Sequence, residues 1–239
     1  MMESADGRRY AIYFAPSPES ALYRFGSAWL GRDGLTGAEF DSPLLDGLPL
    51  ERWRRVTAAP RLYGFHATLK PPFHLSSDTS ADELAGDIER FANAHESFEA
   101  PPLRLARIAR FLALVPQASS PALSALADAC VRDFDRFRAS PGADELARRE
   151  RAGLTSRQRE LLALWGYPYV LDEWRFHMTL ASGLDRGEAD ELCRILDPLA
   201  SPYSAAPLVV DAICLFEQPA PQASFRGVRR FPLRQRAGE

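Results

Sequence analysis

The pentapeptide Phe65-His66-Ala67-Thr68-Leu69 recurs 111 residues later as Phe176-His177-Met178-Thr179-Leu180, with one substitution between the copies. The chain contains only four histidines, and two of them stand at the same position of this repeat. Because histidine is so scarce here, chance is a poor explanation for the match. The two copies therefore mark corresponding strands of a duplicated unit.

Each copy of the repeat has one apolar and one polar face. Successive side chains of a strand point to opposite sides, so the phenylalanine, the small or flexible residue and the leucine pack inward together. The opposite side of each strand carries a histidine, a threonine and one cation. These polar residues are His66, Thr68 and Lys70 in the first copy and Arg175, His177 and Thr179 in the second.

The repeat extends beyond the pentapeptide. Each copy is followed by a stretch of helical periodicity and then by two strand-like segments. We therefore predict internal halves at approximately residues 61–116 and 172–233, joined by a helical connection over 120–166. Residues 1–239 are expected to form a single bilobed domain of the α+β class, with two mainly antiparallel sheets and flanking helices around a central cleft.

Other segments give simpler signals. Alternating apolar residues predict a strand over 8–15, and Ser17 is a plausible N-cap for a helix over 17–30. The high Gly, Pro and Asp content over 31–60 predicts a long surface excursion beside the site. Helical periodicity returns over 144–165.

Composition narrows the classes of protein. A net charge of -3 and a pI of about 5.9 argue against a basic surface that would hold a long nucleic acid. The three cysteines, Cys130, Cys193 and Cys214, fit neither a disulfide framework nor a CxxC metal site. The chain starts without an apolar leader and has no 18-residue apolar run, so we expect a cytoplasmic protein with no membrane contact.

The polar residues of the repeat suit a phosphodiester. An imidazole with a pKa of about 6.5 can take or give a proton at neutral pH, so one histidine can act as base and the other as acid. Threonine hydroxyls donate to phosphate oxygens, and cations offset the charge that develops there, so the scheme requires no metal and no cofactor. The candidate site residues are the catalytic pair His66 and His177, the phosphate-binding residues Thr68, Thr179, Lys70 and Arg175, and the cleft aromatics Tyr13 and Tyr63.

The two His-x-Thr-Leu motifs resemble those of the two-histidine (2H) phosphoesterase superfamily. This resemblance implies a bilobed α+β fold in which the motifs face each other across a cleft, with the histidines as the acid–base pair and the threonines as phosphate ligands. A narrower likeness points to the branch associated with bacterial phosphonate-utilisation operons, and it implies a phosphoester intermediate of phosphonate breakdown. Its stretches are Arg9–Phe14, Tyr63–Lys70, Trp165–Val170 and Arg175–Leu180.

We therefore expect a metal-independent phosphoesterase that hydrolyses the cyclic phosphodiester of a small phosphorylated metabolite, acting as a monomer. Alternatives are an enzyme of short RNA ends (a 2′,3′-cyclic phosphodiesterase or 2′–5′ ligase-like protein) and a non-catalytic phosphate-binding regulatory module. Residues 153–162 look like the first helix of a DNA-binding helix-turn-helix, but residues 166–169 lead into the second motif instead of a recognition helix. A metal hydrolase would need a third converging ligand, which no HxxxH or HxD pair supplies.

Overall fold

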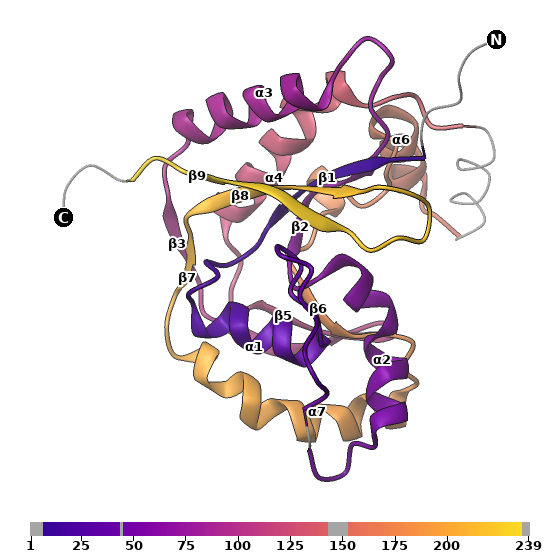
Figure 1. Cartoon of the computed structure of the whole chain (residues 1–239), viewed down its shortest axis with the longest axis vertical. Helices are drawn as coiled ribbons and strands as arrows, with labels where there is room; N and C mark the ends of the chain where they lie inside the picture. The colour runs from indigo at the N-terminus through magenta and orange to yellow at the C-terminus, as the bar shows by residue number, and fades with distance from the viewer. Residues whose placement is uncertain (1–6, 44, 143–152, 236–239) are drawn as a thin grey trace.

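The computed structural model describes residues 7–43, 45–142 and 153–235 (Figure 1). Helices and strands alternate irregularly along the chain, as the α+β class requires. The helices are α1 (Ala21–Leu30), α2 (Leu50–Tyr63), α3 (Ala81–Ala94), α4 (Pro121–Asp133), α6 (Ser156–Trp165) and α7 (Arg186–Ala200). The strands are β1 (Arg9–Phe14), β2 (Ala67–Phe73), β3 (Phe98–Ala100), β4 (Leu103–Ile108), β5 (Phe111–Pro116), β6 (Met178–Ala181), β7 (Leu208–Val210), β8 (Ala212–Gln218) and β9 (Arg226–Pro232).

Most of the strands form one large sheet. Its order is β4-β5-β6-β2-β1-β8-β9, and every neighbouring pair is antiparallel. A second, two-stranded sheet pairs β3 with β7. Helix α3 lies beside β8 and β9 and α4 lies beside β2, whereas α1 and α2 lie beside β6 and α7 lies beside β4 and β5 (Figure 1). The predicted α+β class is confirmed, with one large and one small antiparallel sheet.

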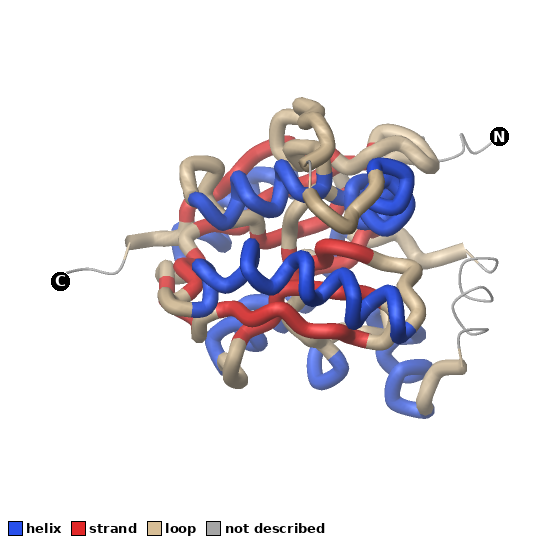
Figure 2. The backbone as a smooth tube through the Cα atoms, turned by 90° about the horizontal axis from the view of Figure 1, so that it is seen from below, coloured by secondary structure: helices blue, strands red, loops and turns tan. Residues whose placement is uncertain are grey.

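The two sequence repeats are interleaved within the large sheet. Strands β4 and β5 belong to the first repeat, yet β5 pairs with β6 of the second. Strands β8 and β9 belong to the second repeat, yet β8 lies next to β1, which pairs with β2 of the first. Helices lie outside these strands when the molecule is seen from below (Figure 2). The boundaries of the halves stay a prediction, because the sheet mixes strands from both.

The two motif strands meet at the centre of the large sheet. Strands β2 and β6 are neighbours there, and Ala67 pairs with Met178. The predicted apolar residues of both copies are buried, which fixes the register, because a one-residue slip would turn the histidines into the core. These residues are Phe65, Ala67, Leu69, Phe176, Met178 and Leu180.

Side-chain caps set where the helices begin. The helix predicted over 17–30 starts at Ala21, because the Ser20 side chain, and not that of Ser17, accepts from the Tyr23 backbone N–H. Helix α3 begins with a reciprocal capping box between Ser80 and Glu83. The helix predicted over 144–165 is present from Ser156 to Trp165; residues 143–152 lie outside the described part of the chain.

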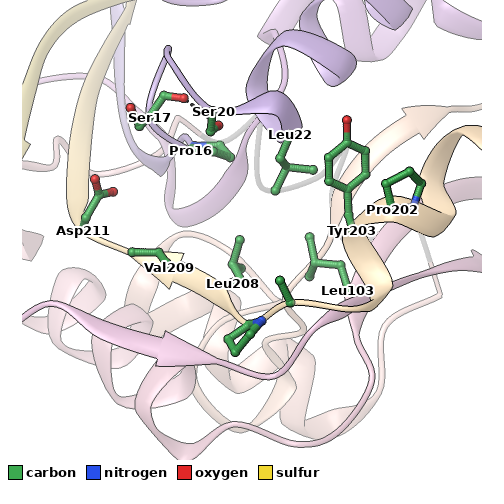
Figure 3. A pocket seen from close by; sticks show the side chains of 12 residues that line it. Pro16, Ser17, Ser20, Leu22, Leu103, Pro202, Tyr203, Leu208, Val209 and Asp211 are labelled. Atoms are coloured by element: carbon green, nitrogen blue, oxygen red, sulfur yellow. Dashed lines mark hydrogen bonds between the residues drawn. The ribbon is translucent and has the colours of Figure 1, made fainter.

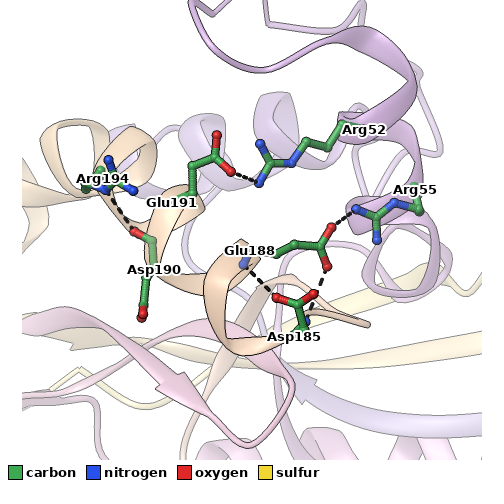
Figure 4. A network of polar contacts seen from close by, with 7 residues as sticks. All are labelled: Arg52, Arg55, Asp185, Glu188, Asp190, Glu191 and Arg194. Atoms are coloured by element: carbon green, nitrogen blue, oxygen red, sulfur yellow. Dashed lines mark hydrogen bonds and ion pairs between the residues drawn. The ribbon is translucent and has the colours of Figure 1, made fainter.

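The predicted excursion over 31–60 is wrong in its second part. Helix α2 occupies residues 50–63 and packs beside α7, where Arg52 lies 2.7 Å from Glu191 and Arg55 pairs with Glu188 (Figure 4). Trp53 buries its ring and donates its indole N–H to the Trp29 carbonyl. The Gly and Pro residues hid this helix, because Pro49 and Gly64 mark its two ends.

Candidate active site

The two motif histidines are held in the same way. His66 Nδ1 lies 2.9 Å from the carbonyl oxygen of Gly64, and His177 Nδ1 lies 2.8 Å from that of Arg175. A carbonyl oxygen only accepts, so Nδ1 must be the protonated nitrogen in each neutral ring. Both rings therefore present Nε2, with its lone pair, to their surroundings. This tautomer is the one that a general base at Nε2 requires.

The position of His66 depends on Gly64. Gly64 has φ +76° and ψ 178°, a combination that is essentially restricted to glycine, and a Cβ here would lie 2.5 Å from the Gly34 Cα. This backbone turns the Gly64 carbonyl toward the imidazole. On its other side the imidazole stacks on Tyr13, with ring centroids 3.8 Å apart. The ring is thus held from two directions.

The position of His177 depends on the segment before β6. Trp174 donates its indole N–H to the backbone carbonyl of Thr68, 2.8 Å away, and so ties this segment to the first motif strand. Phe111 of β5 supports the His177 ring, with centroids 5.4 Å apart. Each histidine therefore has a carbonyl partner and an aromatic neighbour, although these come from unrelated elements.

The pairing of β2 with β6 crosses the two motifs. Continued by one residue in each direction from Ala67 and Met178, the antiparallel register sets Thr68 opposite His177 and His66 opposite Thr179. His66 Nε2 also lies 3.3 Å from the Thr68 hydroxyl. This extended register brings the two histidines and the two threonines to the same part of the sheet.

Burial keeps both imidazoles neutral. It lowers the pKa of His66 to about 4, against the opposing hydrogen bond to the Gly64 carbonyl, and His177 lowers it a little further. Burial also lowers the pKa of His177, again against its hydrogen bond to the Arg175 carbonyl. The influence of one ring on the other is a sign of their proximity. In the free protein near neutral pH both rings are therefore uncharged.

A cavity of about 1100 Å³ opens at the second motif. Its walls are formed by β4, β5, the first turn of α4 and the segment that leads into β6. Of the predicted site residues, Thr68, Arg175 and His177 line it. Other polar and aromatic residues on its walls are Arg104, Arg107, Gln117, Ser119, Ser120, Ser124, Glu173, Phe111, Tyr167, Tyr169, Trp174 and Phe176.

The family model for a protein of unknown function, DUF1045, matches residues 68–226, well over half of the sequence. The chain belongs to the DUF1045 family. This assignment and the paired His-x-Thr strands agree with the resemblance to the 2H phosphoesterase superfamily that we noted in the sequence.

Two curated relatives of this DUF1045 protein carry the name ribose 1,5-bisphosphate phosphokinase PhnN. The one from Janthinobacterium sp. (strain Marseille) is 36% identical over 94% of this chain and 51% of its own length. The one from Laribacter hongkongensis (strain HLHK9) is 35% identical over 91% of this chain and 50% of its own. The chain thus spans about half the length of the curated relatives it matches.

Solved structures similar to the DUF1045 chain are more distant in sequence. E. coli LigT in apo form is 14% identical, with 95% of this chain and 98% of that chain covered, at a TM-score of 0.44. TT0787 of Thermus thermophilus is also 14% identical, with the same coverage and a TM-score of 0.46.

Lys70 of this DUF1045 chain does not lie with the other residues that were predicted to bind phosphate. It is 2% exposed, and its ammonium donates to the Val131 carbonyl at 3.0 Å and to Asp135 at 3.3 Å, below the last turn of α4. Burial lowers the Lys70 pKa to about 8, against its interaction with Asp135. The sequence could not show that α4 covers this end of β2. The prediction that Lys70 contacts phosphate is corrected to a structural role.

The prediction that Tyr13 and Tyr63 line the cleft is also corrected. Tyr13 is 1% exposed and lies behind His66, so it supports the imidazole and is not open to a substrate. Tyr63 stacks on Phe225, with ring centroids 5.2 Å apart, and does not line the cavity. The aromatic residues that line the cavity are instead Phe111 of β5 and, from the stretch between α6 and β6, Tyr167, Tyr169, Trp174 and Phe176.

Arg104 and Arg107 of β4 are cavity residues that the sequence did not single out. Among 28 arginines nothing in the local pattern separates these two from surface residues. The signal that could have found them is the β4–β5 hairpin, which recurs after each motif and therefore had to lie beside one of the motif strands.

A second cavity of about 240 Å³ lies elsewhere, between the start of α1 and β7 (Figure 3). Its walls are mostly apolar, with Leu103, Tyr203 and Leu208 among them, so it offers little for an anion. Within the described ranges, no group of three or more His, Cys, Asp or Glu side chains is arranged to hold a metal ion. No described helix is long and apolar enough to cross a membrane.

Proposed function

We propose that this protein is a phosphoesterase that hydrolyses the cyclic phosphodiester of a small phosphorylated metabolite, in a reaction linked to phosphonate metabolism. His66 and His177 are the acid–base pair, and no metal is required. The observation that carries the proposal is the matched placement of the two rings, each with Nδ1 on the carbonyl two residues back, which leaves Nε2 as the nitrogen that exchanges the proton.

The proposed reaction begins with attack of water on phosphorus. One imidazole takes the water proton at Nε2, and a new P–O bond forms. The bond to one ring oxygen of the cyclic ester breaks, and the other histidine, as imidazolium, gives its proton to that alkoxide. The products are a phosphomonoester and a free hydroxyl. The hydroxyls of Thr68 and Thr179 donate to the non-bridging oxygens, where charge develops.

The acid must first gain a proton, because burial holds both imidazoles neutral in the free protein. A bound phosphodiester is an anion, and a negative charge within about 4–6 Å raises the pKa of an imidazole. Substrate binding thus converts one of two equivalent bases into the acid. Each proton transfer of this kind contributes roughly 10²–10⁴ to the rate.

The relatives support a sugar phosphate as the substrate class. Their name describes a kinase of ribose 1,5-bisphosphate, but this chain has no Gly-rich phosphate loop ending in Lys, and its one lysine is buried. We infer that the kinase activity belongs to one half of such relatives and that this chain corresponds to the half without it. Opening a cyclic phosphate of a phosphorylated ribose would yield a ribose bisphosphate, the class of compound on which a kinase so named acts.

The deciding experiment is a hydrolysis panel with and without EDTA. It contains ribosyl cyclic phosphates, 2′,3′-cyclic nucleotides and short RNA with a 2′,3′-cyclic end. Preferred turnover of the ribosyl esters supports the proposal, whereas preference for the RNA end makes the protein an RNA-end enzyme. Binding without turnover of any ester would leave only a phosphate-binding module. Loss of turnover in EDTA, with recovery on metal addition, would refute metal independence.

A further inference from the structure

Arg104 lies on β4, two strands away from β6, which carries the second motif. It pairs with Val115 of β5, and the neighbouring residue Leu114 pairs with Met178, which directly follows His177. Two strand spacings amount to roughly 10 Å between the backbones of Arg104 and the His177 segment. Arg104, Val115 and His177 all line the same cavity. The arginine therefore stands near the reacting centre, but not at it.

The guanidinium of Arg104 is available for a ligand. Half of the arginines in the described ranges have a carboxylate partner, as Arg52 has in Glu191. No described carboxylate lies within ion-pair distance of Arg104, Arg107 or Arg175, although all three line the cavity. Three arginines without a described ion-pair partner, two from β4 and one from the segment before β6, line this cavity together with one carboxylate, that of Glu173, and this excess of positive charge favours an anionic ligand.

The size of the cavity also exceeds what one phosphate diester requires. Its volume of about 1100 Å³ is at the upper end of small-ligand sites, which are roughly 300–1,000 Å³. Ser120, which caps α4, also lines the cavity, so the positive end of that helix lies at the cavity. There is room for a pentose and a second anionic group beyond the reacting ester.

We propose that Arg104 forms a second phosphate subsite, which binds a phosphomonoester of the substrate that does not react. This inference rests on the proposed function, and it narrows the substrate class to sugar cyclic phosphates that carry a further terminal phosphate. Arg104 is then a specificity-determining residue. It contributes to substrate binding and takes no part in proton transfer.

The test compares two substrates that differ in one group: a ribosyl cyclic phosphate with and without a phosphate on O5. Charge-assisted hydrogen bonds are worth about 1.5–3 kcal/mol, so the wild type should prefer the phosphorylated ester roughly 10- to 100-fold in kcat/KM. Arg104→Ala should abolish that preference, mainly through KM, and leave turnover of the unphosphorylated ester within about twofold. Arg110→Ala is the matched control, because Arg110 is exposed at the tip of the same hairpin and lies outside the cavity wall.

Two outcomes would overturn the subsite and leave the proposed function standing. One is equal wild-type turnover of both esters; the other is an equal loss on both in Arg104→Ala. If neither ester were hydrolysed, the proposed function would fail, and calorimetric titration with ribose 5-phosphate would decide the subsite. Tenfold weaker binding to Arg104→Ala than to wild type and Arg110→Ala supports it. No binding to the wild type, or equal binding to all three, overturns it.

Discussion

Trp174 donates its indole N–H to the backbone carbonyl of Thr68 at 2.8 Å, across 106 residues of sequence. This bond joins the segment that carries His177 to the strand that carries Thr68. A single antiparallel pair, Ala67 with Met178, connects β2 and β6. The indole bond therefore adds a second link where the sheet pairing is shortest, and it sets the spacing of the two motifs.

Trp174→Phe should lower kcat/KM for the cyclic ester about tenfold, because it removes this link and keeps most of the apolar packing. The lost hydrogen bond should cost about 0.5–1.5 kcal/mol of unfolding free energy in urea titrations. Trp29→Phe is the matched control: Trp29 donates to the Leu180 carbonyl, also at 2.8 Å, but lies outside the cavity. Equal activity losses in both variants would reduce the Trp174 bond to a general stability effect.

Gly64→Ala should detach His66 from its carbonyl partner. The backbone conformation at this position is reserved for glycine, and the added Cβ would lie 2.5 Å from the Gly34 Cα. We therefore expect the free energy of unfolding to fall by about 1–3 kcal/mol and most of the activity to be lost. Gly37→Ala provides the comparison, because Gly37 also has a positive φ of +80° but nothing within 4 Å of the added Cβ. Retained activity in Gly64→Ala would contradict the role of its carbonyl.

Lys70→Ala should lower the free energy of unfolding and leave the KM for the cyclic ester unchanged. The variant removes a nearly buried ammonium from the Val131 carbonyl, while Asp135 keeps Arg138 at 2.8 Å. We expect a loss of about 1–3 kcal/mol in the free energy of unfolding. A raised KM with unchanged stability would restore Lys70 to the phosphate-binding residues.

The low pKa of His66 predicts an acid-sensitive fold. The unfolded chain binds more protons than the folded chain between about pH 6.5, the ordinary pKa, and about 4, the pKa in the fold. The stability gained from the neutral ring is therefore present above pH 6.5 and is lost as pH falls toward 4. In His66→Asn, the urea midpoint should fall less than in wild type between pH 7 and pH 5. Parallel falls in both proteins would be evidence against the depressed pKa.

Much of the fold was predictable because it repeats. The strands and the helical stretch after each motif follow from local periodicity, and the helical stretch after the first motif is present as α3 (Ala81–Ala94). The interleaving of the repeats was not predictable, since pairing between β5 and β6 depends on contacts between residues far apart in sequence. Helix α2 was missed for a local reason, because its flanking Pro and Gly residues resemble those of a loop.

The chemical centre of the site was predictable, and its surroundings were not. Alternation placed His66 and Thr68 on one face, which agrees with their 3.3 Å contact. Alternation alone also placed Lys70 there, but the end of α4 covers that part of the strand. Arg104 is on β4, far along the chain from both motifs. It reaches the cavity only because β4 pairs with β5.

The central claim is that His66 and His177 act together as a metal-independent acid–base pair. The most direct test measures kcat/KM for the cyclic ester in EDTA, for wild type, His66→Ala and His177→Ala, with circular dichroism as the check on folding. The account predicts full wild-type activity in EDTA and a loss of at least roughly 10²-fold in each folded variant. Full activity in either variant would contradict it.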